Sequence, residues 1–586
     1  MNGSQHILDA LKRHQIHTVF GYPGGCIMPL YDALVAEEEN IQHVLCRHEQ
    51  ACALAADGYA RASGRSGVCI ATSGPGATNL ITGVANAHRD SIPMLVITGQ
   101  VPTSLIGTDA FQETDMLGMT LGIVKHSYLV TCPDDLPGVI EEALRLAESG
   151  RPGPVWVDIP KDVLLADIGA YQYSATSASE ITEHAFSSHK VDSTPELAPK
   201  LRTALEWLRE AQRPLLYSGG GISLAQAEQP FRAFASISGL PGVVSLKGIG
   251  NPGRQAPHQL GMLGMHGSQA ANRAVDACDL LIVIGARMDD RATGALSGFA
   301  PNARIIHIDC DPAELNKLKP AHLNLCGELA PLLDSLTDAL REQPLTITDW
   351  QAQCDQWRRD CGFTIPPMAD DRISGPEFIR ALGEHLPGDS IIACDVGQHQ
   401  MWVAQHYPFD HPRHHLTSGG LGTMGYGLPA AIGAQFAQPH RTVVNVSGDG
   451  SFMMNVQELV TVRSHNLPLK LVILDNQCLG MVRQQQELFY GNRESQIALN
   501  DNPDFCALAR ACGIPALSVE TQSEVATALQ QVLAHEGPIL LHVAIDRNEN
   551  VWPIVKPGAA NAEMIDIAQG LNQTCIEPKR QKEHRT

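Results

Sequence analysis

The 586-residue sequence contains no uninterrupted run of 18 or more apolar residues. Its first residues, MNGSQHILDALKRH, do not place a positively charged stretch before an apolar core. The first absence argues against a membrane-spanning helix, and the second argues against a secretion signal. We therefore expect a cytoplasmic protein that has no membrane partner.

The cysteines lack the spacing of a metal site or of a disulfide framework. The 15 cysteines are scattered, none forms a CxxC pair, and several lie inside apolar runs such as GVCIATS and IIACDVG. Cysteines of this kind are typical of a reduced interior.

The chain also lacks an excess of positive charge. Its formal net charge is −21, so most of its surface repels nucleic acid and anionic membranes, and we expect no nucleic-acid partner. The short basic stretch KRQKEHRT at the end is most simply a solvated tail. A composition of 44% hydrophobic and 18% charged residues is that of an ordinary globular protein.

The length and the pattern of the chain predict three α/β units. The chain is too long for one hydrophobic core, and short apolar segments such as PMLVITG, LLIVIGAR and LKLVILDN alternate with helix-length segments. This alternation predicts doubly wound domains with central, mainly parallel sheets. We expect domains at residues 1–165, 197–345 and 376–550, linkers at 166–196 and 346–375, and a C-terminal tail at 551–586.

One motif in the third unit predicts a site for a metal-held diphosphate. The apolar run TVVNVS is followed by Gly-Asp-Gly, a helix-length segment from Ser451 to about His465, the run LKLVIL and then Asp-Asn. Because parallel strands carry their carboxyl ends to one edge of a sheet, Asp449 and Asn476 should lie side by side. Their oxygens suit Mg²⁺, and the glycines let backbone N–H groups approach phosphates.

Taken alone, Gly-Asp-Gly is usually a tight turn, but a hairpin would need a strand directly after it. The composite instead resembles the diphosphate-binding signature of thiamine-diphosphate enzymes. Glu49, after the short strand HVLC, is equally ambiguous from the residues alone. It could be an acid that favours the positive end of a helix, or a ligand group at a sheet edge.

Further segments extend the resemblance. Three segments of the first unit resemble the pyrimidine-binding domain of thiamine-diphosphate enzymes: PGG, RHEQ with the following AADGYAR, and SGPGATN. Other segments resemble the catalytic subunits of the acetohydroxyacid synthase (acetolactate synthase) family, and among these the biosynthetic bacterial isozyme II type. These segments are SIPMLVITGQV, SGRPGPVWVDIPKDV, VIGARMDDRATG, GGLGTMGYGLPAA and NVWPIVKPGAANAEM. That family joins pyruvate, after loss of CO₂, to a second 2-oxo acid, either pyruvate or 2-oxobutyrate.

The resemblance implies thiamine diphosphate, Mg²⁺ and FAD as cofactors. Glu49 would hydrogen-bond the aminopyrimidine and promote removal of the thiazolium C2 proton, and Met424 would support the bent cofactor. The other implied thiamine-diphosphate contacts are Pro75, Asn79, Val396, Gln398, His399, Gly448, Gly450 and Ser451. The implied Mg²⁺ ligands are Asp449, Asn476 and the backbone of Cys478.

The implied flavin contacts are Arg151, Gly219, Gly220, Met265, His266, Gly267, Gly285, Arg287, Asp309 and Glu328. Gln112, Lys161 and Arg287 would be catalytic residues, with Gly25, Phe111, Met262 and Gln485 near the substrate. Arg287 could also be an ordinary surface arginine, although its planar fork suits a carboxylate. The resemblance further implies a homodimer or tetramer with active sites at subunit interfaces, and it makes a small regulatory subunit a candidate partner.

One departure from the family concerns specificity. The family usually has MVRQW where this chain has MVRQQ, so Gln485 replaces a tryptophan that packs against 2-oxobutyrate. We expect a weak preference for 2-oxobutyrate and reduced sensitivity to sulfonylurea inhibitors. The alternatives are a pyruvate oxidase or catabolic synthase on the same scaffold, or a regulatory paralogue, which should have lost Glu49, Asp449 or Asn476.

Overall fold

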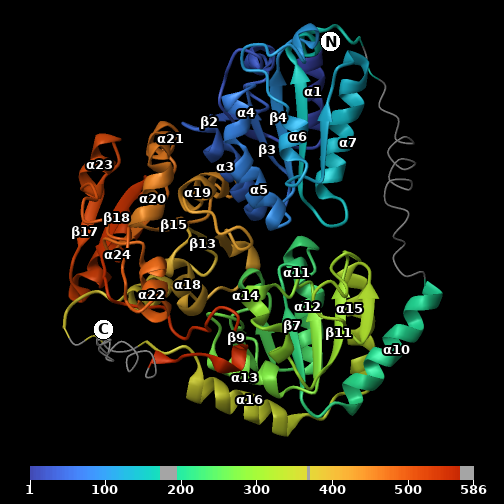
Figure 1. Ribbon diagram of the computed structural model, residues 1–586, viewed down its shortest axis with the longest axis vertical. Helices are drawn as coiled ribbons and strands as arrows, with labels where there is room; N and C mark the ends of the chain where they lie inside the picture. Colours follow the sequence, from blue (N-terminus) through green and yellow to red (C-terminus); the bar gives the residue numbers. More distant parts are fainter. Residues whose placement is uncertain (170, 172–193, 366–367, 369, 568–586) are drawn as a thin grey trace, which may run out of the picture.

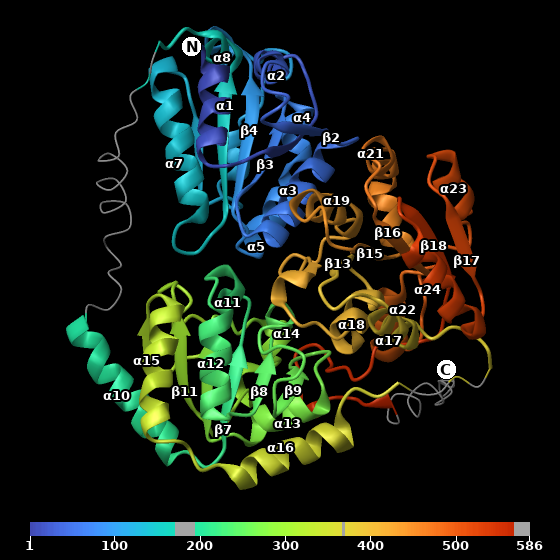
Figure 2. The same ribbon diagram turned by 180° about the vertical axis from the view of Figure 1, so that it is seen from behind.

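The computed structural model describes residues 1–169, 171, 194–365, 368 and 370–567. Three α/β units form three lobes, coloured blue, green and orange to red along the chain (Figures 1 and 2). Each unit contains a sheet whose paired strands all run parallel, as the alternating pattern predicts. Within the described part of the chain, no helix is both long and apolar enough to cross a membrane.

The first unit has the strand order β2-β1-β3-β4-β6-β5. Its core strands are apolar and fully buried because helices cover both faces of the sheet. The strands are β1 (Thr18–Gly21), β2 (Gln42–Leu45), β3 (Gly67–Ala71), β4 (Met94–Gln100), β5 (His126–Leu129) and β6 (Pro154–Pro160). The helices are α1 (Gly3–Arg13), α2 (Met28–Val35), α3 (Glu49–Ser63), α4 (Pro75–Asn79), α5 (Ile81–Arg89), α6 (Met116–Thr120), α7 (Leu136–Glu148) and α8 (Lys161–Leu165).

The third unit has the strand order β14-β13-β15-β16-β18-β17, which repeats the order of the first unit position by position. Its strands are β13 (Ile391–Cys394), β14 (His415–Thr417), β15 (Val443–Gly448), β16 (Lys470–Asp475), β17 (Ala516–Val519) and β18 (Ile539–Ala544). Its helices are α17 (Gly375–His385), α18 (Gln398–His406), α19 (Gly427–Ala437), α20 (Asp449–Phe452), α21 (Leu459–Ser464), α22 (Gly480–Phe489), α23 (Phe505–Ala511) and α24 (Val525–Ala534).

The middle unit has a different strand order, β12-β11-β10-β7-β8-β9. Its strands are β7 (Pro214–Ser218), β8 (Gly242–Val244), β9 (Gln259–Met262), β10 (Leu280–Ile284), β11 (Arg304–Asp309) and β12 (Leu323–Cys326). Its helices are α10 (Thr194–Glu210), α11 (Gly221–Leu224), α12 (Glu228–Ser238), α13 (Gln269–Ala277), α14 (Asp290–Thr293), α15 (Leu329–Glu342) and α16 (Thr348–Cys361).

Parts of two segments that were expected to be a linker and a tail pack against the domains. Within residues 346–375, helix α16 buries Trp350 and Cys354 in the core of the middle unit, along the lower side of that lobe in Figure 1. Val551 and Val555, in the expected C-terminal tail, are also buried. Most of the expected linker at 166–196 and the basic end of the chain lie outside the described residues.

The first and third units share one core through helices α3 and α19, which lie against each other in both views (Figures 1 and 2). The two helices are rich in alanine and glycine, so their backbones approach closely. A Cβ atom added to Gly58 would lie 2.3 Å from the Ala430 carbonyl oxygen, and one added to Gly433 would lie 1.9 Å from the Ala55 carbonyl oxygen. Only glycine allows this contact at both positions.

Candidate functional site

Acidic side chains gather at the carboxyl edge of the third sheet. Asp395 follows β13, Asp449 follows β15 and Asp475 ends β16, and these strands are neighbours in the sheet. The strand order reverses between β13 and β15, which is where open α/β sheets bind ligands. The expected convergence of the Gly-Asp-Gly turn and the Asp-Asn end is therefore confirmed.

Asp449 and Asp475 form a buried carboxylate pair. The Asn502 side-chain amide nitrogen lies 2.8 Å from Asp449 Oδ2 and 3.4 Å from Asp475 Oδ1, so it bridges the two. Burial, together with the negative charge of Asp475, raises the pKa of Asp449 to about 7. Although burial opposes it, the hydrogen bond from His542 at 3.0 Å holds the pKa of Asp475 below its ordinary value.

Asn476, the implied second metal ligand, lies in a network of amides. Its side-chain nitrogen donates to Gln398 Oε1 at 3.3 Å, and its side-chain oxygen accepts from the Cys478 backbone N–H at 3.2 Å. Gln398 also donates to Gln484 Oε1 at 3.1 Å. The implied ligands Asn476 and Cys478 thus share one turn, next to the implied diphosphate contact Gln398.

The Gly-Asp-Gly turn opens a short helix. The Gly448 N–H lies 3.2 Å from His399 Nε2 and 3.2 Å from Ser451 Oγ. Burial lowers the pKa of His399 to about 3, so the ring is neutral and can accept this hydrogen bond. The crossover predicted as one helix is instead α20, the 3-10 turn η7 (Met453–Glu458) and α21, because Asn455 has non-helical angles, φ −134° and ψ 28°.

A loop before α19 carries Met424 to this edge. Asp395 accepts hydrogen bonds from the N–H groups of Gly425 at 2.9 Å and Gly427 at 3.0 Å. A Cβ atom added to Gly450 would lie 3.9 Å from Met424 Cε, so the methionine tip reaches the Gly-Asp-Gly turn. Val396, another implied contact, follows Asp395 directly and donates its N–H to the Asp395 carboxylate at 2.8 Å.

Glu49 lies at the corresponding edge of the first sheet. It is the first residue of α3, which begins shortly after β2 ends at Leu45, and Asn79 donates its side-chain amide to Glu49 Oε2 at 3.0 Å. The glycine-rich turn after β3 leads into α4, which begins at Pro75, and Gly76 lies beside the Glu49 carboxylate. The structure therefore brings together Glu49, Pro75 and Asn79, the implied contacts on the pyrimidine side.

The implied substrate residues divide into two groups. Gln112 packs over Gly74 at this same edge, with a positive φ of 62° that is uncommon for a residue with a side chain. Gly25 is exposed near β1, Lys161 begins α8, and Phe111 has 87% of its surface exposed. In contrast, Met262 has only 4% of its surface exposed, in an apolar cluster, while Gln485 is exposed on α22.

Most of the implied flavin contacts follow strands of the middle sheet. The order of this sheet reverses between β7 and β10, and Gly219 and Gly285 follow these two strands. A Cβ atom on Gly219 would lie 2.2 Å from the Gly285 carbonyl oxygen, so the turns are closely packed. The remaining members are Gly220 after β7, Met265, His266 and Gly267 after β9, Asp309 at the end of β11, and Glu328 after β12.

Arg151 and Arg287 join the first and middle units. Arg151 contacts Asp311 at 3.2 Å and Glu314 at 2.6 Å, and it donates to Ser91 Oγ at 2.8 Å. Arg287 donates to the Arg89 carbonyl oxygen. Their roles toward flavin and substrate remain predictions.

Sequence reasoning did not single out three polar residues that organise the site: Asp395, Asp475 and Asn502. Asp395 and Asp475 stand at the ends of apolar runs, as Asp449 does, so their position after a strand was a usable signal. Asn502 lies in a connection with no repeating pattern, and its role follows only from its long-range contacts.

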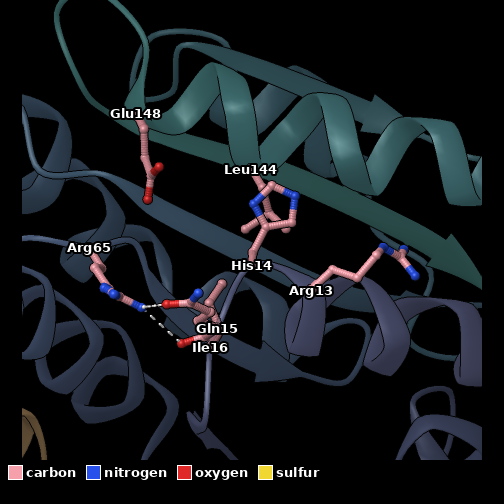
Figure 3. A pocket seen from close by; sticks show the side chains of 7 residues that line it. All are labelled: Arg13, His14, Gln15, Ile16, Arg65, Leu144 and Glu148. Atoms are coloured by element: carbon pink, nitrogen blue, oxygen red, sulfur yellow. Dashed lines mark hydrogen bonds between the residues drawn. The ribbon is translucent and has the colours of Figure 1, made fainter. Parts of the chain in front are cut away.

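A surface cavity of about 250 Å³ lies elsewhere in the first unit. Figure 3 shows Arg65 donating to Gln15, with His14 and Leu144 beside them. The lining residues are Arg13, His14, Gln15, Ile16, Arg65, Leu144 and Glu148. Ile16 and Arg65 precede β1 and β3, so this cavity is at the amino edge of the sheet, opposite the edge that carries Glu49.

Comparisons with known proteins agree with this geometry. Residues 1–119 match the family described as thiamine pyrophosphate enzyme, N-terminal TPP binding domain. Residues 201–336 match its central domain, and residues 395–543 match its C-terminal TPP binding domain.

Curated relatives match nearly the whole chain. It is 52% identical to the acetolactate synthase isozyme 2 large subunit of Escherichia coli (strain K12), over 97% of this chain and 100% of that protein. It is 46% identical to the acetolactate synthase large subunit of Parasynechococcus marenigrum (strain WH8102), over 98% and 93% of the two chains. It is 44% identical to the Escherichia coli isozyme 1 large subunit, over 96% and 97%. The chain therefore belongs to the acetolactate synthase large subunit family of thiamine pyrophosphate enzymes.

Proposed function

We propose that this chain decarboxylates pyruvate and joins the remaining two carbons to the carbonyl carbon of a second 2-oxo acid. The products are 2-acetolactate from pyruvate and 2-aceto-2-hydroxybutyrate from 2-oxobutyrate, with one CO₂ released per turnover. This is a reaction of branched-chain amino acid biosynthesis. The observation that carries the proposal is the convergence of Asp449, Asp475 and Asn476 at the switch point of the third sheet.

The residues at this edge fit a magnesium diphosphate. Two buried carboxylates face each other there, with Asn502 as their shared donor, and burial together with the negative charge of Asp475 raises the pKa of Asp449. A divalent cation would neutralise that excess of negative charge, with Asp449, Asn476 and the Cys478 carbonyl as ligands. The Gly450 and Ser451 N–H groups, at the start of α20, suit phosphate oxygens.

Thiamine diphosphate would supply a carbon acid and an electron sink when bound. Glu49 would hold a proton at the aminopyrimidine, with Asn79 keeping its carboxylate in place. Gln112, over the same glycine-rich turn, would orient the acceptor acid. Lys161 and Arg287 would recognise substrate carboxylates.

The middle unit fits FAD. Closely packed glycines follow β7 and β10 at the switch point, which is where dinucleotides bind in sheets of this strand order. Asp309, at the end of β11, is buried, and burial raises its pKa to about 6. A carboxylate held there suits a hydrogen bond to a hydroxyl of the flavin nucleotide.

We propose that the active protein is a homodimer or a tetramer, with the homodimer as the smallest active unit. Phe111, Met119 and Leu121 are exposed apolar side chains on the segment beside Gln112, and Met453 and Met454 are exposed next to the Gly-Asp-Gly turn. Apolar surface on both halves of the site supports closure by a second copy. The relatives are named large subunits, which supports a small regulatory subunit as a further partner.

The test is turnover of mixed pyruvate and 2-oxobutyrate with thiamine diphosphate, Mg²⁺ and FAD, under anaerobic conditions. We expect acetolactate and acetohydroxybutyrate, without hydrogen peroxide. With Gln485 in place of an apolar wall, the excess of acetohydroxybutyrate should be small. Release of acetate or peroxide without either product would contradict the proposal.

A further inference from the structure

The loop that carries Met424 is fastened by the first unit of the same chain. This loop, residues 418–426, joins β14 to α19. Asp90, the residue after α5, accepts hydrogen bonds from the N–H groups of Gly419 at 3.0 Å and Gly420 at 2.7 Å. These contacts join residues of the first and third units that are far apart in the sequence.

Asn86, on the last turn of α5, holds the same loop by two hydroxyl groups. Ser418 Oγ lies 2.5 Å from Asn86 Oδ1, and Thr423 Oγ1 lies 3.2 Å from the same oxygen. The Thr423 N–H in turn donates to Ser418 Oγ at 2.9 Å, which closes the loop on itself. Thr423 directly precedes Met424.

Asn86 and Asp90 are themselves held by buried charges. Asn86 donates to Asp57 Oδ2 at 3.2 Å, and Arg61 donates to Asp57 at 2.5 Å and to Asp90 at 2.9 Å. Although burial alone would raise it, the positive charges of Lys247 and Arg61 and the Gly419 hydrogen bond lower the pKa of Asp90 below its ordinary value. Asp90 is therefore ionised and can accept both backbone N–H groups.

We propose that Asn86 and Asp90 are positioning residues that set the place of Met424. The inference rests on the function proposed above and on the role that the family resemblance implies for Met424, which is to support the bent cofactor. It assigns the first unit a second task. Glu49 would act at the pyrimidine, while the C-terminal end of α5 would set the shape of the loop that carries Met424. Asp395, which holds Gly425 and Gly427, fixes the other end of the loop.

The Thr423 hydroxyl gives the sharpest test. Thr423→Val keeps the shape but loses the hydrogen bond to Asn86, whereas Thr423→Ser keeps the hydroxyl. Asn86→Ala removes the acceptor from the other side. Thr337→Val is the matched control, because it deletes another buried hydroxyl, bonded to the Leu333 carbonyl at 2.7 Å on α15 of the middle unit.

Two readouts separate positioning from stability. The first is deuterium exchange of the thiazolium C2 proton in bound thiamine diphosphate, followed by NMR after acid quench. The second is cofactor affinity by calorimetry with Mg²⁺. If Met424 is displaced, the exchange should slow about tenfold in Thr423→Val and Asn86→Ala. Affinity, which the diphosphate dominates, should change by no more than about threefold. Thr423→Ser and Thr337→Val should exchange like the parent.

The inference would be overturned if Thr423→Val and Asn86→Ala exchanged at the parental rate and only their melting temperature fell. Thr423 and Asn86 would then contribute to stability alone. Slow exchange in the Thr337→Val control would overturn it too, since the effect would then not depend on the loop. Failure of the parent protein to bind thiamine diphosphate with Mg²⁺ would contradict the proposed function itself, and the inference with it. That failure is distinguishable because no variant is needed to see it.

Discussion

The first and third units share one strand order and differ at the carboxyl edge of the sheet. In the third unit Asp395, Asp449 and Asp475 stand at the ends of three neighbouring strands, whereas in the first unit Glu49 stands beside glycine-rich turns. One scaffold therefore presents three carboxylates at the ends of neighbouring strands in the third unit, and Glu49 beside glycine-rich turns in the first. The scaffold fixes where a ligand binds, and the residues after each strand decide which ligand it is.

The middle unit sharpens this contrast. The similar sizes of the three units suggest a duplication. The strand order of the middle unit is different, however, so the topology does not support a duplication of all three. The match is confined to the first and third units. These two also share a core through α3 and α19, while the middle unit has cores of its own.

The largest expected effect concerns Glu49, at the carboxyl edge of the first sheet. Glu49→Gln keeps the size of the side chain and its contact with Asn79 but removes the charge that would hold a proton at the cofactor. We expect kcat for acetolactate formation to fall about 10²- to 10⁴-fold, with cofactor affinity little changed. Glu39→Gln, an exposed acid of the same unit, is the control. Unimpaired turnover by Glu49→Gln would remove Glu49 from the chemistry.

A smaller effect concerns the junction of the two similar units. In Gly433→Ala the added methyl would meet the Ala55 carbonyl oxygen, so α3 and α19 must move apart. We expect a loss of about 1–3 kcal/mol in stability, measured by denaturant unfolding. Gly388→Ala adds the same methyl where nothing lies within 4 Å and should be neutral. Equal stability of the two variants would show that the helix contact tolerates separation.

A pH effect of similar or smaller size comes from Glu458, a buried acid of the third unit. It accepts the Arg47 N–H at 2.8 Å, two residues before Glu49. Burial raises its pKa from 4.5 to about 7. The folded state thus favours the protonated form, so its contribution to stability is lost as the pH rises from about 4.5 to about 7.

Glu458→Gln cannot ionise and should lack this loss, which we expect to be on the order of 2 kcal/mol. Melting temperatures at pH 5 and pH 8 check it, with the exposed Glu342→Gln as control. If parent and Glu458→Gln lose stability equally over this range, Glu458 does not titrate there.

The smallest expected effect concerns specificity. Gln485→Trp would restore the flat apolar wall that the family usually has, and we expect the preference for 2-oxobutyrate over pyruvate to rise about tenfold. Competition between the two acids measures the ratio, and Gln485→Ala, which adds no flat surface, should leave it nearly unchanged. An unaltered ratio in Gln485→Trp would place the specificity wall elsewhere.

Much of the third unit could be predicted because its strands are short, β-branched and buried on both faces. The run TVVNVS and the run LKLVIL became β15 and β16, and their parallel pairing brought Asp449 and Asp475 together. The first unit was predictable for the same reason at β3 and β4, which are buried along their whole length.

What sequence reasoning missed depends on contacts distant in the chain. The crossover after Asp449 breaks at Asn455, whose side-chain amide donates to the Gly425 carbonyl oxygen at 2.7 Å, a contact that no local pattern reveals. Helix α16 was not predicted, because it is mostly exposed and buries only Trp350 and Cys354, which gives a weak apolar pattern. Met262 lies in an apolar cluster, because β9 packs against the third unit through it.

The most direct test of the central claim is a crystal structure of the protein with thiamine diphosphate, Mg²⁺ and FAD. We predict Mg²⁺ at the edge of the third sheet, about 2.1 Å from oxygens of Asp449, Asn476 and the Cys478 backbone. The diphosphate should lie over Gly450 and Ser451, with the aminopyrimidine beside Glu49 of a second copy. A metal bound away from Asp449 and Asn476, or a diphosphate held by the first sheet, would contradict the account.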